Sequence, residues 1–212
     1  MRAEHSNVGT TNRSDEEELC EVLLRTESLK FGTFKLASGI LSPYYVDFRN
    51  IPSDQEAFRR VINCYLALLE PKMAKRVQRL AAIQTSGIAY ASVLAFKLSK
   101  PFLYVRSETK EHGRERRIES LLRPGDKVLV LDDVVTTGKN ILEAAEIIRS
   151  EGGVVEDAAV LLDRQQGGAV NLRRIGVKLH AFTTMRRIAD RLVALGTIDE
   201  TQHKAIVRQI VS

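Results

Sequence analysis

One stretch decides the fold: Val128-Leu129-Val130-Leu131-Asp132-Asp133-Val134-Val135-Thr136-Thr137-Gly138-Lys139-Asn140. Its four leading apolar residues predict a buried strand over 128–131, and a helix is predicted from about Gly138 to Ser150. Between the two lies what we call the phosphate loop, residues 132–140, which starts with two acids and continues with small and hydroxyl-bearing residues. A loop of this kind offers a phosphate its backbone N–H groups, its hydroxyls and the helix dipole.

The two acids, Asp132 and Asp133, would repel a phosphate. They therefore suit a neighbouring group that donates hydrogen bonds, such as a ribose 2′,3′-diol. The acid pair and the phosphate loop together indicate a phosphorylated sugar as the ligand. An acid pair at the end of a strand also occurs as a magnesium site or a helix cap. The stretch contains neither the GxxxxGK(S/T) of a Walker A loop nor the GxGxxG of a Rossmann fold.

Short apolar strands alternate with amphipathic helical segments, which predicts an α/β fold with a mostly parallel, doubly wound sheet. The predicted strands are Leu80–Ile83, Phe102–Val105, Val128–Leu131, Ala158–Leu162 and Leu179–Phe182. Ligands of such sheets bind beyond the carboxyl ends of the strands, near a change in strand order. The polar residues that directly follow the strands are therefore the first candidates for a site.

The length of 212 residues predicts one domain, which we place over 14–212, behind a polar and flexible tail over 1–13. Ser14 is expected to cap a helix that runs to about Glu27. Two short helices, broken at Gly196, are predicted at the C-terminal end.

The region after the first helix is predicted to hold short strands between Phe31 and Asn50. Ser53 or Asp54 is then expected to cap a second helix, which ends before Pro71.

Composition narrows the class of protein. Hydrophobic residues make up 44% and charged residues 28%, which excludes a largely disordered chain, and the net charge of +5 suits an anionic small molecule or nucleic acid. The longest uncharged stretch, 80–96, is too short and too polar to span a membrane, and no secretory signal is visible. Cys20 and Cys64 form no CxxC pattern, which favours a reducing cytoplasm over a disulfide scaffold or a zinc site.

The stretch 128–140 resembles the motif with which type I phosphoribosyltransferases bind phosphoribosyl pyrophosphate (PRPP). The motif has four hydrophobic residues, two acids, two hydrophobic or small residues and Thr-Thr-Gly. The resemblance implies the type I phosphoribosyltransferase fold, with a small N-terminal hood at about residues 14–50. It also implies PRPP binding by residues of the phosphate loop: Asp132, Asp133, Val134, Val135, Thr136, Thr137, Gly138, Lys139 and Asn140.

Three further segments resemble the orotate phosphoribosyltransferases: FGTFKLASGILSPYY at 31–45, YVRSETKEHG at 104–113 and LLDRQQGG at 161–168. This resemblance implies transfer of the 5-phosphoribosyl group from PRPP to orotate, with orotidine 5′-monophosphate and pyrophosphate as products, in pyrimidine nucleotide synthesis. It also implies Mg²⁺ as the cofactor, held mainly by PRPP and by no protein side chain directly.

The same resemblance implies roles for single residues. Arg164 is expected to grip the orotate carboxylate through its planar guanidinium. Tyr45 is expected to stack on the base, and Thr136 to contact orotate as well. Catalysis is expected from Asp132 and Asp133, which would hold the ribose diol and steady a positively charged ribose ring.

The polar segment 107–117 implies a loop that closes over a charged substrate. In the family this loop reaches into the site of the neighbouring subunit, which implies a homodimer. Arg106, Lys110 and His112 are expected to bind PRPP, and Lys110 and His112 to neutralise or protonate the departing pyrophosphate.

Three positions depart from the family because they lack a lysine that bacterial members often carry: Ala37, Ser86 and Ser107. The cationic phosphate contacts that such lysines make are therefore missing. The candidates to replace them are Lys35, Lys139 and Arg114.

Two alternative functions share the PRPP motif. A purine-base phosphoribosyltransferase is one, although the 104–113 segment and Arg164 favour an anionic pyrimidine. A transcription regulator that senses PRPP is the other. It would need a DNA-binding domain, and only about 17 residues separate the start of the first predicted helix from Phe31. We therefore expect neither nucleic acid nor a membrane among the partners.

Overall fold

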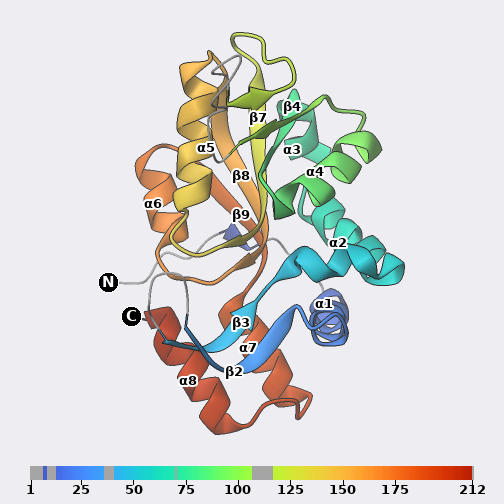
Figure 1. The fold of residues 1–212 in the computed structure, drawn as a ribbon, viewed down its shortest axis with the longest axis vertical. Coiled ribbons are helices and arrows are strands. Elements are labelled where there is room, and N and C mark those ends of the chain that lie inside the picture. The colour runs from blue at the N-terminus through green and yellow to red at the C-terminus, as the bar shows by residue number, and fades with distance from the viewer. Residues whose placement is uncertain (1–6, 9–12, 36–40, 70, 107–116, 212) are drawn as a thin grey trace.

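Two sheets organise the described part of the chain. The computed structural model describes residues 7–8, 13–35, 41–69, 71–106 and 117–211. The strands are β1 Asn7–Val8, β2 Leu29–Lys35, β3 Leu41–Val46, β4 Arg79–Ile83, β5 Phe102–Val105, β6 Ile118–Glu119, β7 Lys127–Val135, β8 Val154–Asp163 and β9 Lys178–Thr184. Within these residues, a seven-stranded sheet has the order β1-β9-β8-β7-β4-β5-β6, and β2 pairs with β3 (Figure 1).

The large sheet is parallel except at its edge, where β5 and β6 are antiparallel. The chain passes from β4 to β5 on one side of β4 and then returns to β7 on the other side. The strand order therefore reverses between β4 and β7, and ligands bind at such a reversal in sheets of this kind. The predicted α/β fold with a mostly parallel sheet is confirmed.

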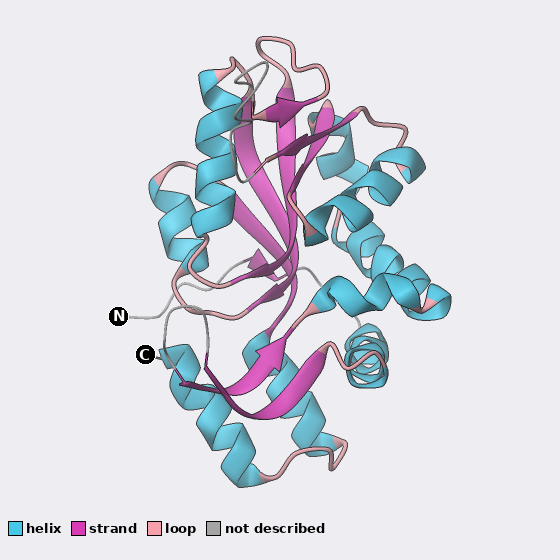
Figure 2. Ribbon diagram, viewed as in Figure 1, coloured by secondary structure: helices cyan, strands magenta, loops and turns pink. Residues whose placement is uncertain are grey.

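Helices cover both faces of this sheet (Figures 1 and 2). One face carries α2 Gln55–Leu68, α3 Pro71–Arg76 and α4 Ser86–Lys97, and the other carries α5 Lys139–Ser150 and α6 Gly168–Arg174. The helix α2 begins where predicted, because the Asp54 carboxylate accepts the Ala57 N–H at 3.0 Å.

The hood elements lie at one end of the molecule beside the two C-terminal helices (Figure 1). They are α1 Arg13–Arg25, β2, β3 and the 3-10 helix η1 Phe48–Ser53, and the C-terminal helices are α7 Met185–Ala194 and α8 Glu200–Val211. Glu16 of α1 accepts a hydrogen bond from Thr183 at 2.7 Å and pairs with Arg187 of α7 at 2.7 Å. The sequence break at Gly196 separates α7 from α8 as predicted.

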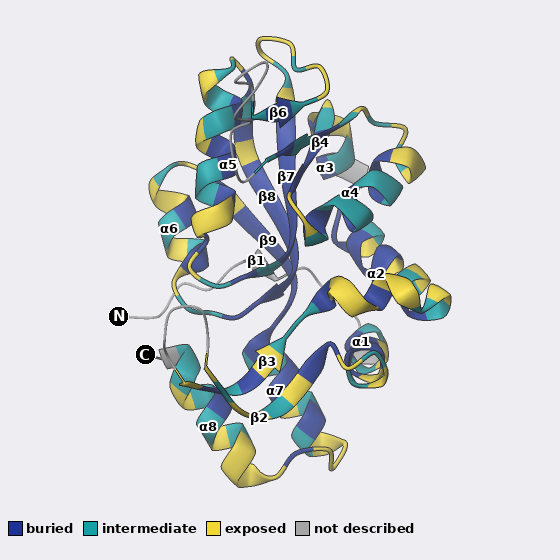
Figure 3. Ribbon diagram, in the orientation of Figure 1, coloured by how far each residue is buried: buried dark blue, intermediate teal, exposed yellow. Residues whose placement is uncertain are grey.

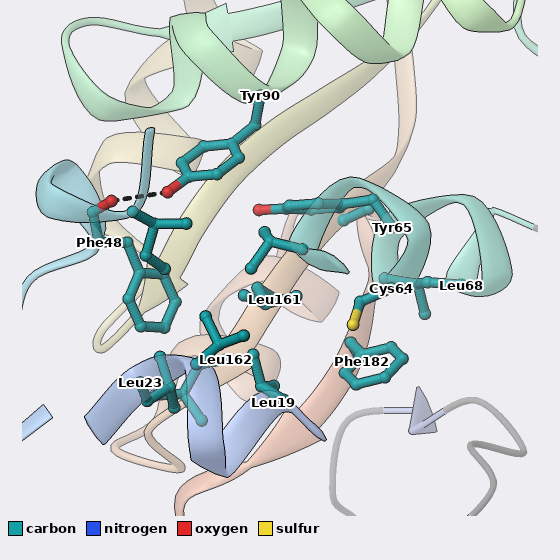
Figure 4. Close-up of a cluster of buried hydrophobic side chains, with 14 of the residues drawn as sticks. Leu19, Leu23, Phe48, Cys64, Tyr65, Leu68, Tyr90, Leu161, Leu162 and Phe182 are labelled. Atoms are coloured by element: carbon teal, nitrogen blue, oxygen red, sulfur yellow. Dashed lines mark hydrogen bonds between the residues drawn. The ribbon is translucent and has the colours of Figure 1, made fainter. Parts of the chain in front are cut away.

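A single hydrophobic cluster joins the hood to the sheet. Leu23 of α1, Tyr65 of α2 and Leu161 of β8 belong to the same buried group (Figure 4), and Figure 3 shows that the central strands of the sheet are buried. Tyr90 lies at its edge and donates a hydrogen bond of 2.6 Å to the Phe48 carbonyl oxygen. This shared cluster packs the hood against the sheet.

The strand β7 is longer than predicted. The apolar run ends at Leu131, yet β7 continues to Val135, because β8 runs beside it and pairs Val134 with Leu162 and Val135 with Asp163. The first four residues of the phosphate loop are therefore held in a central strand, which gives them more rigid support than a loop would.

Other boundaries also differ from the predictions. Within the predicted tail, Asn7 and Val8 form β1 and pair with β9, so these two residues belong to the sheet edge. The first helix spans Arg13–Arg25, so Ser14 lies inside it rather than at its cap. The sequence did not indicate α3, α6 or β6, because two to seven residues are too few for a periodic pattern.

Within the described residues, no helix has the length and apolar character needed to cross a bilayer.

Candidate active site

The phosphate loop lies at the carboxyl end of β7, beside the reversal in strand order. It borders a cavity of about 260 Å³, lined by Asp132, by Val134 to Asn140 and by Ile141. The structure thus brings together around one space eight of the nine loop residues that were predicted to bind PRPP. Lys139 and Asn140 are exposed, and they stand at the start of α5, where the helix dipole favours an anion.

Gly138 lets the backbone turn into α5. It has a φ of +82°, in the left-handed region, and it is the N-cap residue of α5. A Cβ atom built there would lie 3.3 Å from the Gly168 carbonyl oxygen and 3.4 Å from the Leu172 Cγ atom. Both the conformation and the close packing therefore favour glycine at this position.

The N-terminal part of α6 supports the phosphate loop from behind. The Gly168 N–H donates to the Thr136 carbonyl oxygen at 3.0 Å, and the Asn171 side chain donates to the Thr137 carbonyl oxygen at 3.0 Å. These bonds fix the carbonyl groups of Thr136 and Thr137 on α6 and so hold the loop backbone in place.

The acid pair is buried, with Asp132 6% and Asp133 9% exposed. Burial raises the pKa of both carboxyls, and the charge of Asp133 raises the pKa of Asp132 further. Asp132 Oδ1 accepts the Asp133 N–H at 3.0 Å, and Asp133 Oδ1 accepts the Val134 N–H at 2.8 Å. Such desolvated carboxylates gain strongly from hydroxyl donors brought by a ligand.

A second cavity of about 260 Å³ adjoins the first and shares Asn140 with it. Arg106 and Arg117, which flank the segment 107–116, line it together with Glu143 of α5. The Arg117 Nη2 atom donates to the Arg106 carbonyl oxygen at 2.8 Å and to Glu143 at 2.6 Å. Arg106 Nη1 is buried, makes no hydrogen bond within the part of the chain that the structure describes, and forms an ion pair with Glu119 Oε1 at 3.6 Å. A guanidinium with a donor of this kind suits an anionic ligand.

Arg164 follows β8 directly and is only 7% exposed. Its N–H donates to the Val135 carbonyl oxygen at 2.9 Å, which places it next to the end of β7. Its Nε donates to the Tyr44 hydroxyl at 3.1 Å, and its Cζ lies 4.7 Å from the centre of the Tyr44 ring. Its Nη2 is buried and makes no hydrogen bond among the described residues.

Tyr45, the tyrosine that the sequence favoured for stacking, lies on the other side of β3. It is 37% exposed, and its ring centre lies 5.6 Å from that of Phe34. Tyr44 is the ring that contacts Arg164, and it is completely buried. Nothing in the local sequence distinguishes the role of Tyr44 from that of Tyr45, although alternation along a strand requires neighbouring tyrosines to face opposite sides.

Several predicted positions lie outside the described residues: Ala37, Ser107, Lys110, His112 and Arg114. Of the positions that lack a lysine, Ser86 is described, and its hydroxyl lowers the pKa of Asp133 while burial raises it. Lys35 ends β2 and is exposed.

Among the described residues, no three His, Cys, Asp or Glu side chains come close enough to hold a metal ion. Asp132 and Asp133 are the acids at the site, and two neighbouring carboxylates fall short of the six oxygen ligands that Mg²⁺ takes. The donor set therefore suits a Mg²⁺ ion that arrives with most of its oxygen ligands supplied by phosphates and water.

Known proteins are similar to this chain over most of its length. Residues 69–173 match the phosphoribosyl transferase domain family. The chain is 41% identical to the orotate phosphoribosyltransferase of Pyrobaculum islandicum over 193 residues, which cover 91% of this chain and 97% of that protein. It is similar to the crystal structure of orotate phosphoribosyltransferase from Aeropyrum pernix, with a TM-score of 0.76 and 35% identity over 85% of this chain and 99% of that one.

A longer protein is similar as well. The structure of Leishmania donovani UMP synthase matches with a TM-score of 0.83 and 27% identity. The match covers 94% of this chain and 42% of that chain. The fold described above is thus also found as a part of a larger chain.

Proposed function

The chain belongs to the orotate phosphoribosyltransferase family, a family of pentosyltransferases in pyrimidine biosynthesis, and we propose how its residues move the 5-phosphoribosyl group from PRPP to orotate. The observation that carries the proposal is the cavity at the end of β7, where the turn at Gly138 and the start of α5 meet Asp132, the first of the two acids. The loop end of this cavity suits the 5′-phosphate, and the acid end suits the ribose.

The acid pair holds the ribose hydroxyls. Asp132 and Asp133 are buried carboxyls whose pKa is raised, and the 2′- and 3′-hydroxyls supply donors in addition to the backbone N–H groups that they already accept. As the bond to pyrophosphate breaks, positive charge builds on the ribose ring. The negative charge of the pair then stabilises the transition state more than the ground state.

Arg164 recognises the base by binding its carboxylate. Its buried Nη2 lacks a hydrogen-bond partner among the described residues, and the orotate carboxylate supplies one. Thr136 contacts the base from the phosphate loop. Tyr45 lies on the face of β3 away from Arg164, so its ring would have to turn toward the site to stack on the pyrimidine. An anionic base is thereby favoured over a neutral purine, in keeping with the names of the curated relatives.

The leaving pyrophosphate is bound by Arg106, Lys110 and His112. Arg106 brings a buried cationic nitrogen to the second cavity, next to the phosphate loop. Lys110 and His112 neutralise or protonate the departing group. A bound Mg²⁺ would supply further charge neutralisation on the pyrophosphate, and it would be held through PRPP rather than by a set of protein ligands.

We also propose a cytoplasmic homodimer that shares the 107–117 segment between subunits. The cysteines Cys20 and Cys64 are both buried free thiols, and burial raises the pKa of each to about 12. Such thiols are unreactive and suit a reducing compartment.

The test is an assay of orotate consumption with PRPP and Mg²⁺, with and without EDTA. We expect consumption that stops when EDTA removes the ion, and no PRPP consumption with adenine, guanine or xanthine. Consumption of a purine at a rate similar to that of orotate would instead establish a purine-base phosphoribosyltransferase.

A further inference from the structure

Arg164 is held by a residue that lies outside the residues predicted to bind substrate. The Tyr44 hydroxyl accepts a hydrogen bond from Arg164 Nε, and the Tyr44 ring lies against the guanidinium. Burial raises the pKa of Tyr44, so the hydroxyl is neutral and can accept this bond. Tyr44 occupies the Nε edge of the guanidinium, and Nη2 is a buried donor that bonds to no described residue, which leaves it for a ligand.

Tyr44 is in turn held through Ser42. The Ser42 hydroxyl lies 2.7 Å from the Tyr44 carbonyl oxygen and 2.8 Å from Gln209 Oε1 of α8. A hydroxyl has one proton, so it donates to one of these acceptors at a time. While it donates to Gln209, it still accepts the Tyr44 N–H at 3.4 Å, so both residues stay linked through Ser42. The Gln209 amide is oriented by its own donor bond of 3.1 Å to the Leu41 carbonyl oxygen, so its oxygen faces Ser42.

The connections close into a ring. The Gln166 side chain, two residues beyond Arg164, donates to the Gln209 carbonyl oxygen at 3.3 Å. We call the set Gln209, Ser42, Tyr44, Arg164 and Gln166 the polar ring. It joins strand β3 of the hood, the turn after β8 and the last turns of α8, and Figure 1 shows α8 lying beside β3.

We propose that Tyr44 and Gln209 are positioning residues for orotate: through the polar ring they hold the Arg164 guanidinium so that its Nη2 meets the substrate carboxylate. Neither residue needs to touch the substrate. The proposal rests on the proposed role of Arg164, and it makes the C-terminal helix α8 a part of base recognition. A guanidinium fixed in advance loses less rotamer freedom when orotate binds.

Tyr44→Phe tests the first half of the proposal, because it keeps the ring and removes only the acceptor of the Arg164 bond. We expect the KM for orotate to rise by about five- to tenfold, because the loss of one hydrogen bond changes an equilibrium constant by about this factor. The kcat and the KM for PRPP should stay nearly unchanged. The matched control is Tyr90→Phe, which removes a buried hydroxyl from a bond with the Phe48 carbonyl oxygen, outside the polar ring. It should lower Tm by a similar amount and leave the KM for orotate unchanged.

Gln209→Ala tests the second half. We expect the KM for orotate to rise by about threefold to fivefold, since Gln209 acts through two intermediates. Gln202→Ala is the matched control on the same helix. The Gln202 side chain accepts the Asp199 N–H at 3.0 Å, at the other end of α8. Its loss should lower Tm without changing the KM for orotate.

A double-mutant cycle decides whether the effect passes through Arg164. In an Arg164→Ala background, Tyr44→Phe should not raise the KM for orotate any further. The proposal would be overturned if Tyr44→Phe changed the KM for orotate equally with and without Arg164. It would also be overturned if the single variants kept the normal KM for orotate, or if their KM for orotate and their KM for PRPP rose in parallel. If the unaltered chain consumes no orotate at all, the proposed function fails instead, and the two failures are thus distinct.

Discussion

The Tyr65 hydroxyl donates a hydrogen bond of 2.7 Å to the carbonyl oxygen of Asp132. Tyr65 lies on α2, is completely buried and has a pKa that burial raises well above its usual value, so it remains a donor. This bond satisfies the backbone of the first acid and adds the bulk of an aromatic ring beside it. The backbone of the acid pair is therefore anchored to the hydrophobic core through Tyr65, and both carboxyl side chains are buried.

Asp132→Asn should make the protein more stable at neutral pH, because it removes a buried charge that its neighbour repels. We expect the free energy of unfolding at pH 7 to increase by about 1 kcal/mol, while kcat falls at least a hundredfold. The folded pKa is raised, so the unaltered chain loses stability as pH rises from about 4 through that pKa. Urea unfolding from about pH 5 to pH 8 should show the advantage of the variant growing with pH.

Asp157 provides the control of opposite sign. Its Oδ1 lies 2.7 Å from His180 Nε2, and this hydrogen bond together with Arg76 lowers the pKa of Asp157. Its contribution to stability is present above the unfolded pKa and is lost as pH falls through the folded one. Asp157→Asn should therefore reduce the free energy of unfolding at pH 7. A loss of stability in Asp132→Asn as well would contradict the described burial of the acid pair.

Gly138→Ala should weaken PRPP binding by about tenfold, because the new Cβ both strains the turn and crowds the packing on Gly168. Gly125→Ala is the matched control, since Gly125 has the same φ of +82° and open space where a Cβ would stand. Both variants should lose about 1–2 kcal/mol of stability from the left-handed conformation. Calorimetry should show weakened PRPP affinity in Gly138→Ala alone, and an unchanged affinity there would remove the loop from the PRPP site.

Arg164→Ala should raise the KM for orotate about 10- to 150-fold, as loss of a charge-assisted contact worth about 1.5–3 kcal/mol requires. PRPP affinity should stay nearly the same. Arg164→Lys should restore only part of the loss, because an ammonium cannot both bond to Tyr44 and present a second fixed donor. Steady-state kinetics measures these effects, with Arg123→Ala on the exposed surface as the control. A normal KM for orotate in Arg164→Ala would mean that another group reads the carboxylate.

Lys110→Ala and Asp133→Asn should each abolish activity, and a mixture of the two inactive proteins should recover it. If the 107–117 segment serves the neighbouring subunit, each hybrid dimer has one site with an intact lysine and an intact acid pair. Random exchange makes half of the dimers hybrids, so activity should reach about a quarter of that of the unaltered protein. Mixtures that exchange subunits and stay inactive would show that each segment serves its own subunit.

The sequence determined the elements whose signals are local. Short apolar runs, which alternate along the chain with helical segments, predicted β4, β5, β7, β8 and β9. Asp54 was one of the two residues expected to cap α2, and it is the N-cap. The phosphate loop was also recognisable, because its acids, hydroxyls and glycine follow one another directly in the sequence and suit the hydroxyls and the phosphate of one ligand. None of these inferences needed a contact between distant residues.

Only the tertiary structure decided where β7 ends and which tyrosine meets Arg164. The continuation of β7 through the acid pair depends on β8 beside it, and the choice of Tyr44 over Tyr45 depends on how the hood lies on the sheet. The same holds for Gln209, which is 167 positions from Ser42 and reaches it at 2.8 Å. A local pattern can state which residues are able to bind a charged base, but folding alone brings their partners within hydrogen-bonding distance.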